Sequence, residues 1–355
     1  MSTLATLPRR GWRWWRRLPR LRRAGVALLL VLAALLTPVA TAALALRLAY
    51  AGEPRADARS RGRDALWLGH AWVDGRKGEA DVAALAASLR STGIRDLYVH
   101  AGPLEHDGTL HADLHPQAAR LVEQLHRAAP DVRAHAWLGD LVAPEKPEGL
   151  HLDRPEVRAA IAASAGQVLD AGFAGVHLDL EPLHSGDPGF LDVLDRTRAV
   201  TAARGALLSV STPKIDPLPA LHTVGGLAGH PRWWSQAYFG QVARRVDQVA
   251  VMSYDTGMPL PSLYGGYVAQ QTALALEATP ERVDLLVGLP AYHDNGVNHR
   301  ASAETVAAAV RGVRLGLGRT DPGRQRFGVA LYVDFAATPG DWAAYRTGWV
   351  GAGGS

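Results

Sequence analysis

The sequence contains no cysteine. It can therefore form no disulfide, supplies no thiolate nucleophile, and offers no cysteine ligand to zinc or to an iron–sulfur cluster. Charged residues make up 20% of the chain and hydrophobic residues 48%, which excludes a disordered tail, a collagen and a coiled coil. A chain of 355 residues with this composition is long enough for one large α/β domain or two ordinary domains.

Acidic residues are absent from positions 1–50, which hold nine arginines. The whole chain has 38 basic and 34 acidic residues, so residues 51–355 keep 29 basic residues against all 34 acidic ones, a net charge of −5. The formal net charge of +4 therefore comes from the leader and not from the body of the protein. A body with this charge is a poor match for nucleic-acid phosphates, and we expect no nucleic-acid partner.

An apolar segment follows the arginines. Residues 24–46 carry no charge and are long enough to cross the roughly 30 Å hydrocarbon core as a helix. Because the arginines of residues 1–23 precede this segment, the positive-inside rule keeps that end in the cytoplasm and predicts that the body is exported. Small residues at 40–42, after Pro38, resemble a signal-peptide cleavage site. We favour an uncleaved membrane anchor and keep a cleaved, secreted form as the alternative; residues 47–62 are the expected linker.

The body alternates short β-rich runs with Ala- and Leu-rich helical stretches. Eight strands are expected, at residues 65–72, 96–100, 132–138, 175–181, 207–212, 248–254, 284–290 and 328–334. Regular β/α alternation predicts parallel strands covered by helices, and eight units in about 290 residues fit the usual size of a (β/α)8 barrel. We therefore predict an α/β fold with a single TIM barrel over residues 63–350, followed by a short tail at 351–355. An open doubly wound sheet is the alternative, but no G-x-G-x-x-G follows the first strand.

Polar and aromatic residues recur at the carboxyl ends of these strands, where barrels of this kind carry their active sites. They are His70, Trp72, Tyr98, His100, His135, Trp137, Asp179, Glu181, Ser211, Tyr254, Asp255, Tyr292, Tyr332 and Asp334. On the fourth strand, alternation places His177, Asp179 and Glu181 on one face and three aliphatic residues on the other, which suits the helices. The ionisable groups then point into the barrel, where burial is costly unless they pair or take part in chemistry. Two carboxylates two positions apart also repel each other, which predicts a raised pKa for one of them.

Three short motifs resemble those of one family. The segment AGVHLDLE at 174–181 is similar to the D-G-x-D-x-D-x-E signature of glycoside hydrolase family 18, the chitinase-like barrels. The glycine, the last aspartate and the glutamate of that pattern are present, whereas Ala174 and His177 stand in place of the other two aspartates. The segment MSYD at 252–255 is similar to the family's M-x-Y-D, and GLPAY at 288–292 to its G-x-P-x-Y.

The resemblance implies an exported glycoside hydrolase that acts on an N-acetylated amino-sugar polymer and needs no cofactor or metal. Glu181 would be the general acid and then the base, Asp179 would stabilise the substrate-assisted intermediate, and Tyr254 would hold the acetamido oxygen. The other residues expected to contact substrate are His177, Trp72, His100, Trp137, Asp255, Tyr292 and Tyr332. The aromatic residues among them suit the apolar faces of sugar rings. The expected partners are a polysaccharide or oligosaccharide substrate and, through the leader, the membrane.

Two other functions stay open. The substitutions at Ala174 and His177 allow a glycan-binding barrel that has lost catalysis. The second is a metal-dependent hydrolase with histidine ligands at the ends of the first four strands, although no H-x-H or H-E-x-x-H spacing occurs. The four histidines concerned are His70, His100, His135 and His177.

Overall fold

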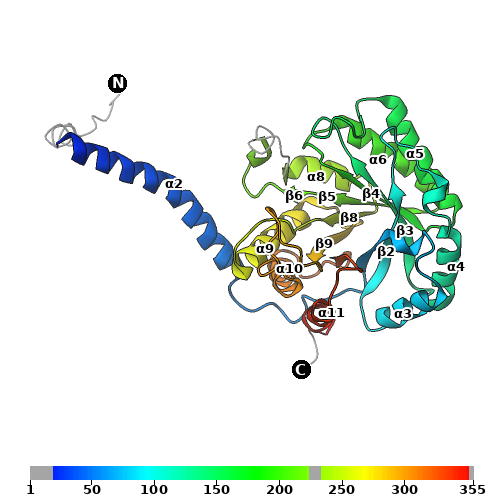
Figure 1. Cartoon of the computed structure of the whole chain (residues 1–355). Coiled ribbons are helices and arrows are strands. Elements are labelled where there is room, and N and C mark those ends of the chain that lie inside the picture. Colours follow the sequence, from blue (N-terminus) through cyan, green and yellow to red (C-terminus); the bar gives the residue numbers. More distant parts are fainter. Residues whose placement is uncertain (1–18, 224–232, 352–355) are drawn as a thin grey trace, which may run out of the picture.

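The computed structural model describes residues 19–223 and 233–351, so most of the arginine-rich segment 1–23 lies outside the described residues. In the described part, eight parallel strands close into a barrel that helices surround (Figure 1). The barrel strands are β1 (Asp64–Leu68), β2 (Ile94–Pro103), β3 (Arg133–Leu141), β4 (Gly175–Glu181), β5 (Leu207–Thr212), β8 (Gln248–Val251), β9 (Asp284–Pro290) and β10 (Phe327–Tyr332). Each strand pairs with its neighbours in chain order, and β1 closes the barrel on β10. The predicted single TIM barrel is confirmed.

Helices follow most of the strands and cover the barrel. They are α3 (Glu79–Leu89), α4 (Ala118–Ala128), α5 (Pro155–Asp170), α6 (Pro188–Ala203), α8 (Gln236–Ala243), α9 (Pro261–Ala278), α10 (Val306–Thr320) and α11 (Pro339–Tyr345). Four of these helices begin with proline, whose fixed φ and missing N–H suit the first helical position. The short elements are the 3-10 helices η1 (His70–Trp72) and η2 (Ala112–Leu114), the π-helical η3 (Arg346–Val350), and the strand pair β6 (Lys214–Ile215) and β7 (Trp233–Trp234).

Three strands end earlier than their sequence pattern predicts. The strand expected at 65–72 stops at Leu68, because the Gly69 N–H donates to Asp334 Oδ1 (2.8 Å) and the chain then turns through η1. The strands expected at 248–254 and 328–334 likewise end at Val251 and Tyr332. Each carboxyl end therefore bends into a loop at the mouth, and these loops carry the polar residues that follow the strands.

The fourth strand has the two faces that its alternation predicts. Val176, Leu178 and Leu180 are buried in the main apolar core beneath the helices. His177 is completely buried on the other face, and its strand neighbours across β3 and β5 are Trp137 and Ser209. Parallel pairing thus places the polar residues of adjacent strands side by side inside the barrel.

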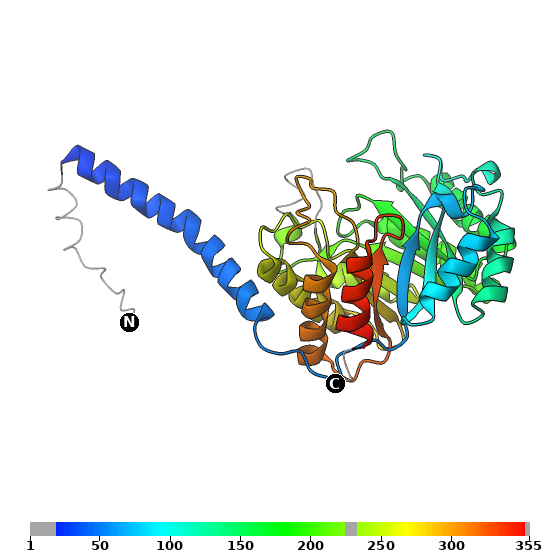
Figure 2. The same ribbon diagram turned by 60° about the horizontal axis from the view of Figure 1, so that its bottom comes forward.

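One long helix, α2 (Arg20–Tyr50), projects away from the barrel (Figures 1 and 2). Its stretch Ala24–Tyr50 has a mean hydropathy of 2.4 and is not buried against the protein, so by length and composition it is able to cross a membrane. The end of α2 packs on α9, where a Cβ atom at Gly266 would collide with the Leu46 carbonyl. The Arg319 side chain donates to the carbonyl groups of Ala49 and Ala51, which caps the carboxyl end of the helix.

Candidate active site

The barrel interior contains a hydrogen-bonded polar cluster near the amino ends of the strands, which we call the lower layer: Asp96, Tyr98, Arg133, His135 and Gln248. Asp96 accepts two bonds from Arg133 (2.7 and 2.9 Å) and lies 2.8 Å from His135 Nε2. Gln248 donates to Asp96 (2.9 Å) and accepts from the Tyr98 hydroxyl (2.6 Å). Burial acts to raise the pKa of Asp96, but His135 and Arg133 outweigh it and hold that pKa well below its usual value.

His177 stands between the lower layer and the mouth. Its Nδ1 is 2.8 Å from the Ser209 hydroxyl and its Nε2 is 2.9 Å from the Ser211 hydroxyl. The imidazole also stacks on Tyr98, with ring centroids 3.7 Å apart. Burial lowers the pKa of His177 well below its usual value, so this ring is neutral at neutral pH. With both nitrogens engaged and no exposed surface, His177 is enclosed beneath the mouth.

Asp179 lies one step nearer the mouth on β4. Its Oδ2 accepts from the Trp137 indole (3.0 Å), whereas its Oδ1 is buried without a hydrogen-bond partner. Burial raises the pKa of Asp179, and the hydrogen-bond donors Trp137 and Ser211 offset only part of this rise. Asp179 therefore has one oxygen held by the protein and one available to a ligand.

Glu181 ends β4 and is exposed in the open mouth. Loss of part of its hydration raises its pKa, and the negative charges of Asp179 and Asp255 raise it further, while Lys214 has the opposite effect. The predicted pair of interacting carboxyls is thus present, and Glu181 keeps its proton at a higher pH than an isolated glutamate does. A carboxyl group in this state is suited to act as a general acid.

Tyrosine rings from three other strand ends line the mouth. Tyr254 stacks on Tyr332 with centroids 5.4 Å apart, and Tyr292 meets both rings edge-on. A Cβ atom at Gly288 would lie 2.8 Å from the Tyr254 ring, so the glycine of the G-x-P-x-Y motif provides the room that this ring needs. Burial raises the pKa of Tyr254 well above its usual value, and nearby Asp179 adds to the rise. Tyr254 therefore stays protonated as a hydrogen-bond donor beside the carboxyl pair.

Asp255 joins this group because the chain has left the strand before reaching it. Its φ of 56° lies in the left-handed region, and its Oδ1 accepts from the Tyr292 hydroxyl at 2.5 Å. The backbone oxygen of Asp255 accepts from Lys214 (3.3 Å), a residue that the sequence analysis did not select. A lysine directly after the fifth strand, among so many strand-end polar residues, was the signal that pointed to it.

The remaining selected residues differ in their access to the mouth. Trp137 is partly exposed and meets the His100 ring edge-on at 4.7 Å. Burial and the neighbouring His70 lower the pKa of His100 to about 4, so His100 is neutral at neutral pH. Trp72 lies in η1, buried, with its indole donating to Asp334 (2.8 Å).

The four strand-end histidines do not form a cluster of metal ligands in the part of the chain that the structure describes. His135 is bound to the lower layer and His177 to two serines. His70 and His100 pack edge-to-face with centroids 5.4 Å apart, and His70 Nδ1 is engaged by the His100 carbonyl. This arrangement gives no support to a metal-dependent hydrolase built on these side chains.

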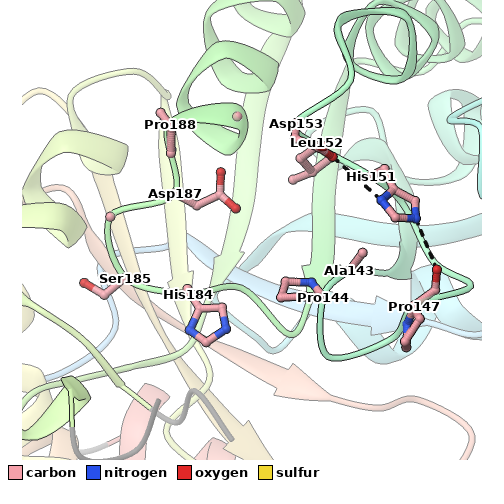
Figure 3. A pocket seen from close by; sticks show the side chains of 12 residues that line it. Ala143, Pro144, Pro147, His151, Leu152, Asp153, His184, Ser185, Asp187 and Pro188 are labelled. Carbon is pink, nitrogen blue, oxygen red and sulfur yellow. Dashed lines mark hydrogen bonds and ion pairs between the residues drawn. The ribbon is translucent and has the colours of Figure 1, made fainter. Parts of the chain in front are cut away.

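A pocket of about 710 Å³ extends the mouth beside β4 (Figure 3). The loops after β3 and β4 form its two walls, with His151 and Asp153 on one side and His184 and Asp187 on the other. Glu145 and His184 form an ion pair between the two loops. Since the second wall begins three residues after Glu181, the pocket continues the site along one side.

Comparisons with known proteins identify the fold. No family model matches the sequence, and no curated protein sequence matches it. The structure is similar to a class V chitinase from Pseudomonas fluorescens (16% identity, TM-score 0.55), covering 80% of this chain and 98% of that one. It is also similar to the spore cortex-lytic enzyme SleL of Bacillus megaterium (13%, 0.57; 82% and 75% covered) and to a Group IV chitinase of Ostrinia furnacalis (16%, 0.53; 81% and 99% covered). At these identities the comparisons establish a shared barrel fold.

Proposed function

We propose that this protein is an exported glycoside hydrolase that cleaves an N-acetylated amino-sugar polymer with the help of the substrate's own acetamido group. The observation that carries the proposal is the carboxyl pair at the barrel mouth. Asp179 has one unpartnered buried oxygen, Glu181 has a raised pKa, and Tyr254 is a protonated donor beside them. The structural neighbours named as chitinases and as a cortex-lytic enzyme support the same reaction class.

In the first step, protonated Glu181 donates its proton to the glycosidic oxygen as the bond to the anomeric carbon breaks. The acetamido oxygen of the same sugar attacks that carbon and forms a cyclic, positively charged intermediate. Oδ1 of Asp179 accepts the acetamido N–H, and the Tyr254 hydroxyl donates to the acetamido oxygen before it attacks. The Trp137 indole holds Asp179 in place through the other carboxylate oxygen.

In the second step, Glu181 is a carboxylate and takes a proton from a water molecule. The water oxygen attacks the anomeric carbon, the bond to the acetamido oxygen breaks, and the sugar is released with its original anomeric configuration. Glu181 regains its proton and the cycle closes. Because the barrel interior disfavours charge on Glu181, this step restores the form that the protein favours.

The rims of the mouth offer the surfaces that sugar rings require. Trp137, Tyr292 and Tyr332 are each partly exposed, so their faces are available to the apolar C–H faces of a saccharide. The neighbouring pocket between the loops after β3 and β4 is large enough to receive a further sugar unit. We assign no substrate contact to His177 or Trp72, since both are buried and their ring nitrogens are engaged.

The leader is proposed to anchor the enzyme in the membrane with the barrel outside. The length and apolar surface of α2 support this, as do the arginines that precede it. A membrane fraction that retains the full-length chain, with the barrel sensitive to protease added outside spheroplasts, is the expected result. A shortened chain released into the medium would instead establish the cleaved form.

The test of the hydrolase is the Glu181→Gln variant. We expect the release of reducing ends from chitin oligosaccharides and peptidoglycan glycan strands to fall by about 10²- to 10⁴-fold, because the amide cannot supply the proton. Oligosaccharide binding, measured by calorimetry, should stay within a few-fold of wild type. Glu148→Gln, the same substitution at an exposed position in the loop after β3, is the matched control and should keep full activity.

A glycan-binding barrel without catalysis is the second candidate. The observation that favours it is the enclosed, neutral His177 in place of a motif aspartate, which leaves Asp179 without a carboxyl neighbour on that side. Wild-type protein that binds these oligosaccharides, yet releases no reducing ends above the Glu181→Gln variant in long incubations, would establish this candidate instead.

A further inference from the structure

A second cluster of ligating side chains lies beside the mouth and takes no part in the proposed hydrolysis. It consists of Asp255, in the loop after β8, and of His299 and Glu304, in the segment between β9 and α10. Their ligand atoms lie within 4.8 Å of one another. His299 is 4% exposed and Glu304 1% exposed, so two of the three groups are fully inside the protein.

His299 is the unusual member of this cluster, because neither of its buried ring nitrogens has a hydrogen-bond partner. Its Nδ1 lies 3.2 Å from Asp255 Oδ1 and 3.6 Å from Glu304 Oε2, but it is hydrogen-bonded to neither oxygen. A buried imidazole that is left unpaired costs about 1–3 kcal/mol. The nitrogen therefore lies against two carboxylates without gaining the bond that would offset its burial.

These separations match the edges of a zinc coordination sphere. With zinc–nitrogen and zinc–oxygen bonds near 2.1 Å, two ligand atoms of a tetrahedral site lie about 3.4 Å apart. The two nitrogen–oxygen distances at His299 fall on either side of this value. Imidazole with two carboxylates suits zinc, whereas calcium takes six to eight oxygen ligands and magnesium keeps most of its waters.

The surroundings orient the three groups and leave an access route. Glu304 accepts the N–H groups of Thr256 (3.1 Å) and Gly257 (2.8 Å), which fixes its carboxylate and holds the loop that begins at Asp255. The Tyr292 hydroxyl binds Asp255, and the Tyr292 ring covers the His299 ring with centroids 4.3 Å apart. The Asp255 side chain is 45% exposed, so an ion and a fourth ligand from solvent can reach the site from the mouth.

The geometry points to a zinc site formed by Asp255, His299 and Glu304, which fastens the loop after β8 to the segment before α10. The site holds the backbone of Asp255 and, through it, the Tyr292 hydroxyl that lines the mouth. Its role is structural and is independent of the proton transfers assigned to Glu181. The expectation from sequence that the chain has no metal is thereby revised by side chains that no short motif connects.

The test uses the full-length chain in detergent, with any affinity tag removed and metals stripped by EDTA. Zinc chloride is titrated by calorimetry, and bound zinc is counted by elemental analysis after gel filtration. We expect one zinc per chain and a rise in the melting temperature on zinc addition, with no rise on addition of calcium or magnesium. His299→Gln and Glu304→Gln should each weaken binding at least tenfold, and the amide oxygen of Glu304→Gln can still accept the two backbone N–H groups.

His293→Gln is the matched control, because His293 is a partly exposed histidine in the same segment that is paired with Asp341 (2.8 Å) instead of with the cluster. It should bind zinc as wild type does. Wild-type protein that binds zinc no more tightly than His299→Gln, or an equal loss in His293→Gln, would overturn the site. Because hydrolysis by zinc-free protein depends on Glu181 alone, either outcome leaves the test of the hydrolase unaffected.

Discussion

The lower layer and the mouth of the barrel contain the same kinds of side chain in opposite electrostatic states. Asp96 in the lower layer has Arg133, His135 and Gln248 as partners, and its pKa lies well below the usual value. Asp179 at the mouth has a single indole donor and an unpartnered oxygen, and its pKa is raised. A carboxylate that the protein satisfies completely stabilises the fold, whereas one that the protein leaves incomplete is available to a substrate.

The comparison predicts that the largest effect on stability comes from Asp96. Asp96→Asn removes the charge that Arg133 and His135 face, so we expect the free energy of unfolding to fall by about 3–5 kcal/mol. Because the folded-state pKa of Asp96 is depressed, its contribution is present above the unfolded pKa of about 4 and is lost as the pH falls below that value. Denaturant titrations of wild type and variant should therefore converge in acid.

Asp131→Asn, at an exposed position just before β3, is the control and should change stability by less than about 0.5 kcal/mol. The comparison would fail if Asp96→Asn were as stable as wild type at neutral pH. It would also fail if the folded variant lost turnover to the extent that Glu181→Gln does.

The second effect is on catalysis and concerns Asp179. Asp179→Asn should lower kcat by about 10²–10³-fold, since the intermediate loses its counter-charge. It should also shift the pH profile of the residual activity, because Asp179 helps to raise the pKa of Glu181. Without that charge Glu181 loses its proton at lower pH, so the alkaline limb of kcat should move down in pH. A profile measured on a soluble amino-sugar glycoside, with its alkaline limb unmoved, would argue against the coupling.

The smallest effect concerns the bond that orients Asp179. Trp137→Phe keeps an aromatic ring but removes the indole donor, which favours the charged form of Asp179. We expect the pKa of Asp179 to rise, the acid limb of the kcat profile to move to higher pH, and kcat at the optimum to fall less than about tenfold. Trp72→Phe removes a similar bond, to Asp334, and should leave the acid limb where it is.

The fold follows from local patterns that the chain repeats eight times. Alternation within residues 175–181 correctly predicted which side chains of β4 face the helices and which face the interior. Strand ends were less predictable, because the bond that stops β1 comes from Asp334, 265 residues away from Gly69. For the same reason Asp255, which strict alternation places on the opposite face from Tyr254, reaches the mouth only because the strand has already ended.

The sequence by itself determined the apolar leader, the β/α alternation and the order of polar residues at the strand ends, since these depend on hydrophobic period and on residues close together in the chain. Only the tertiary structure decided the protonation of His177, the partners of Asp96 and the meeting of Asp255 with His299 and Glu304. Charge states and ligand sets depend on which groups approach within a few ångströms, and in a closed barrel the approaching groups come from different strands and loops.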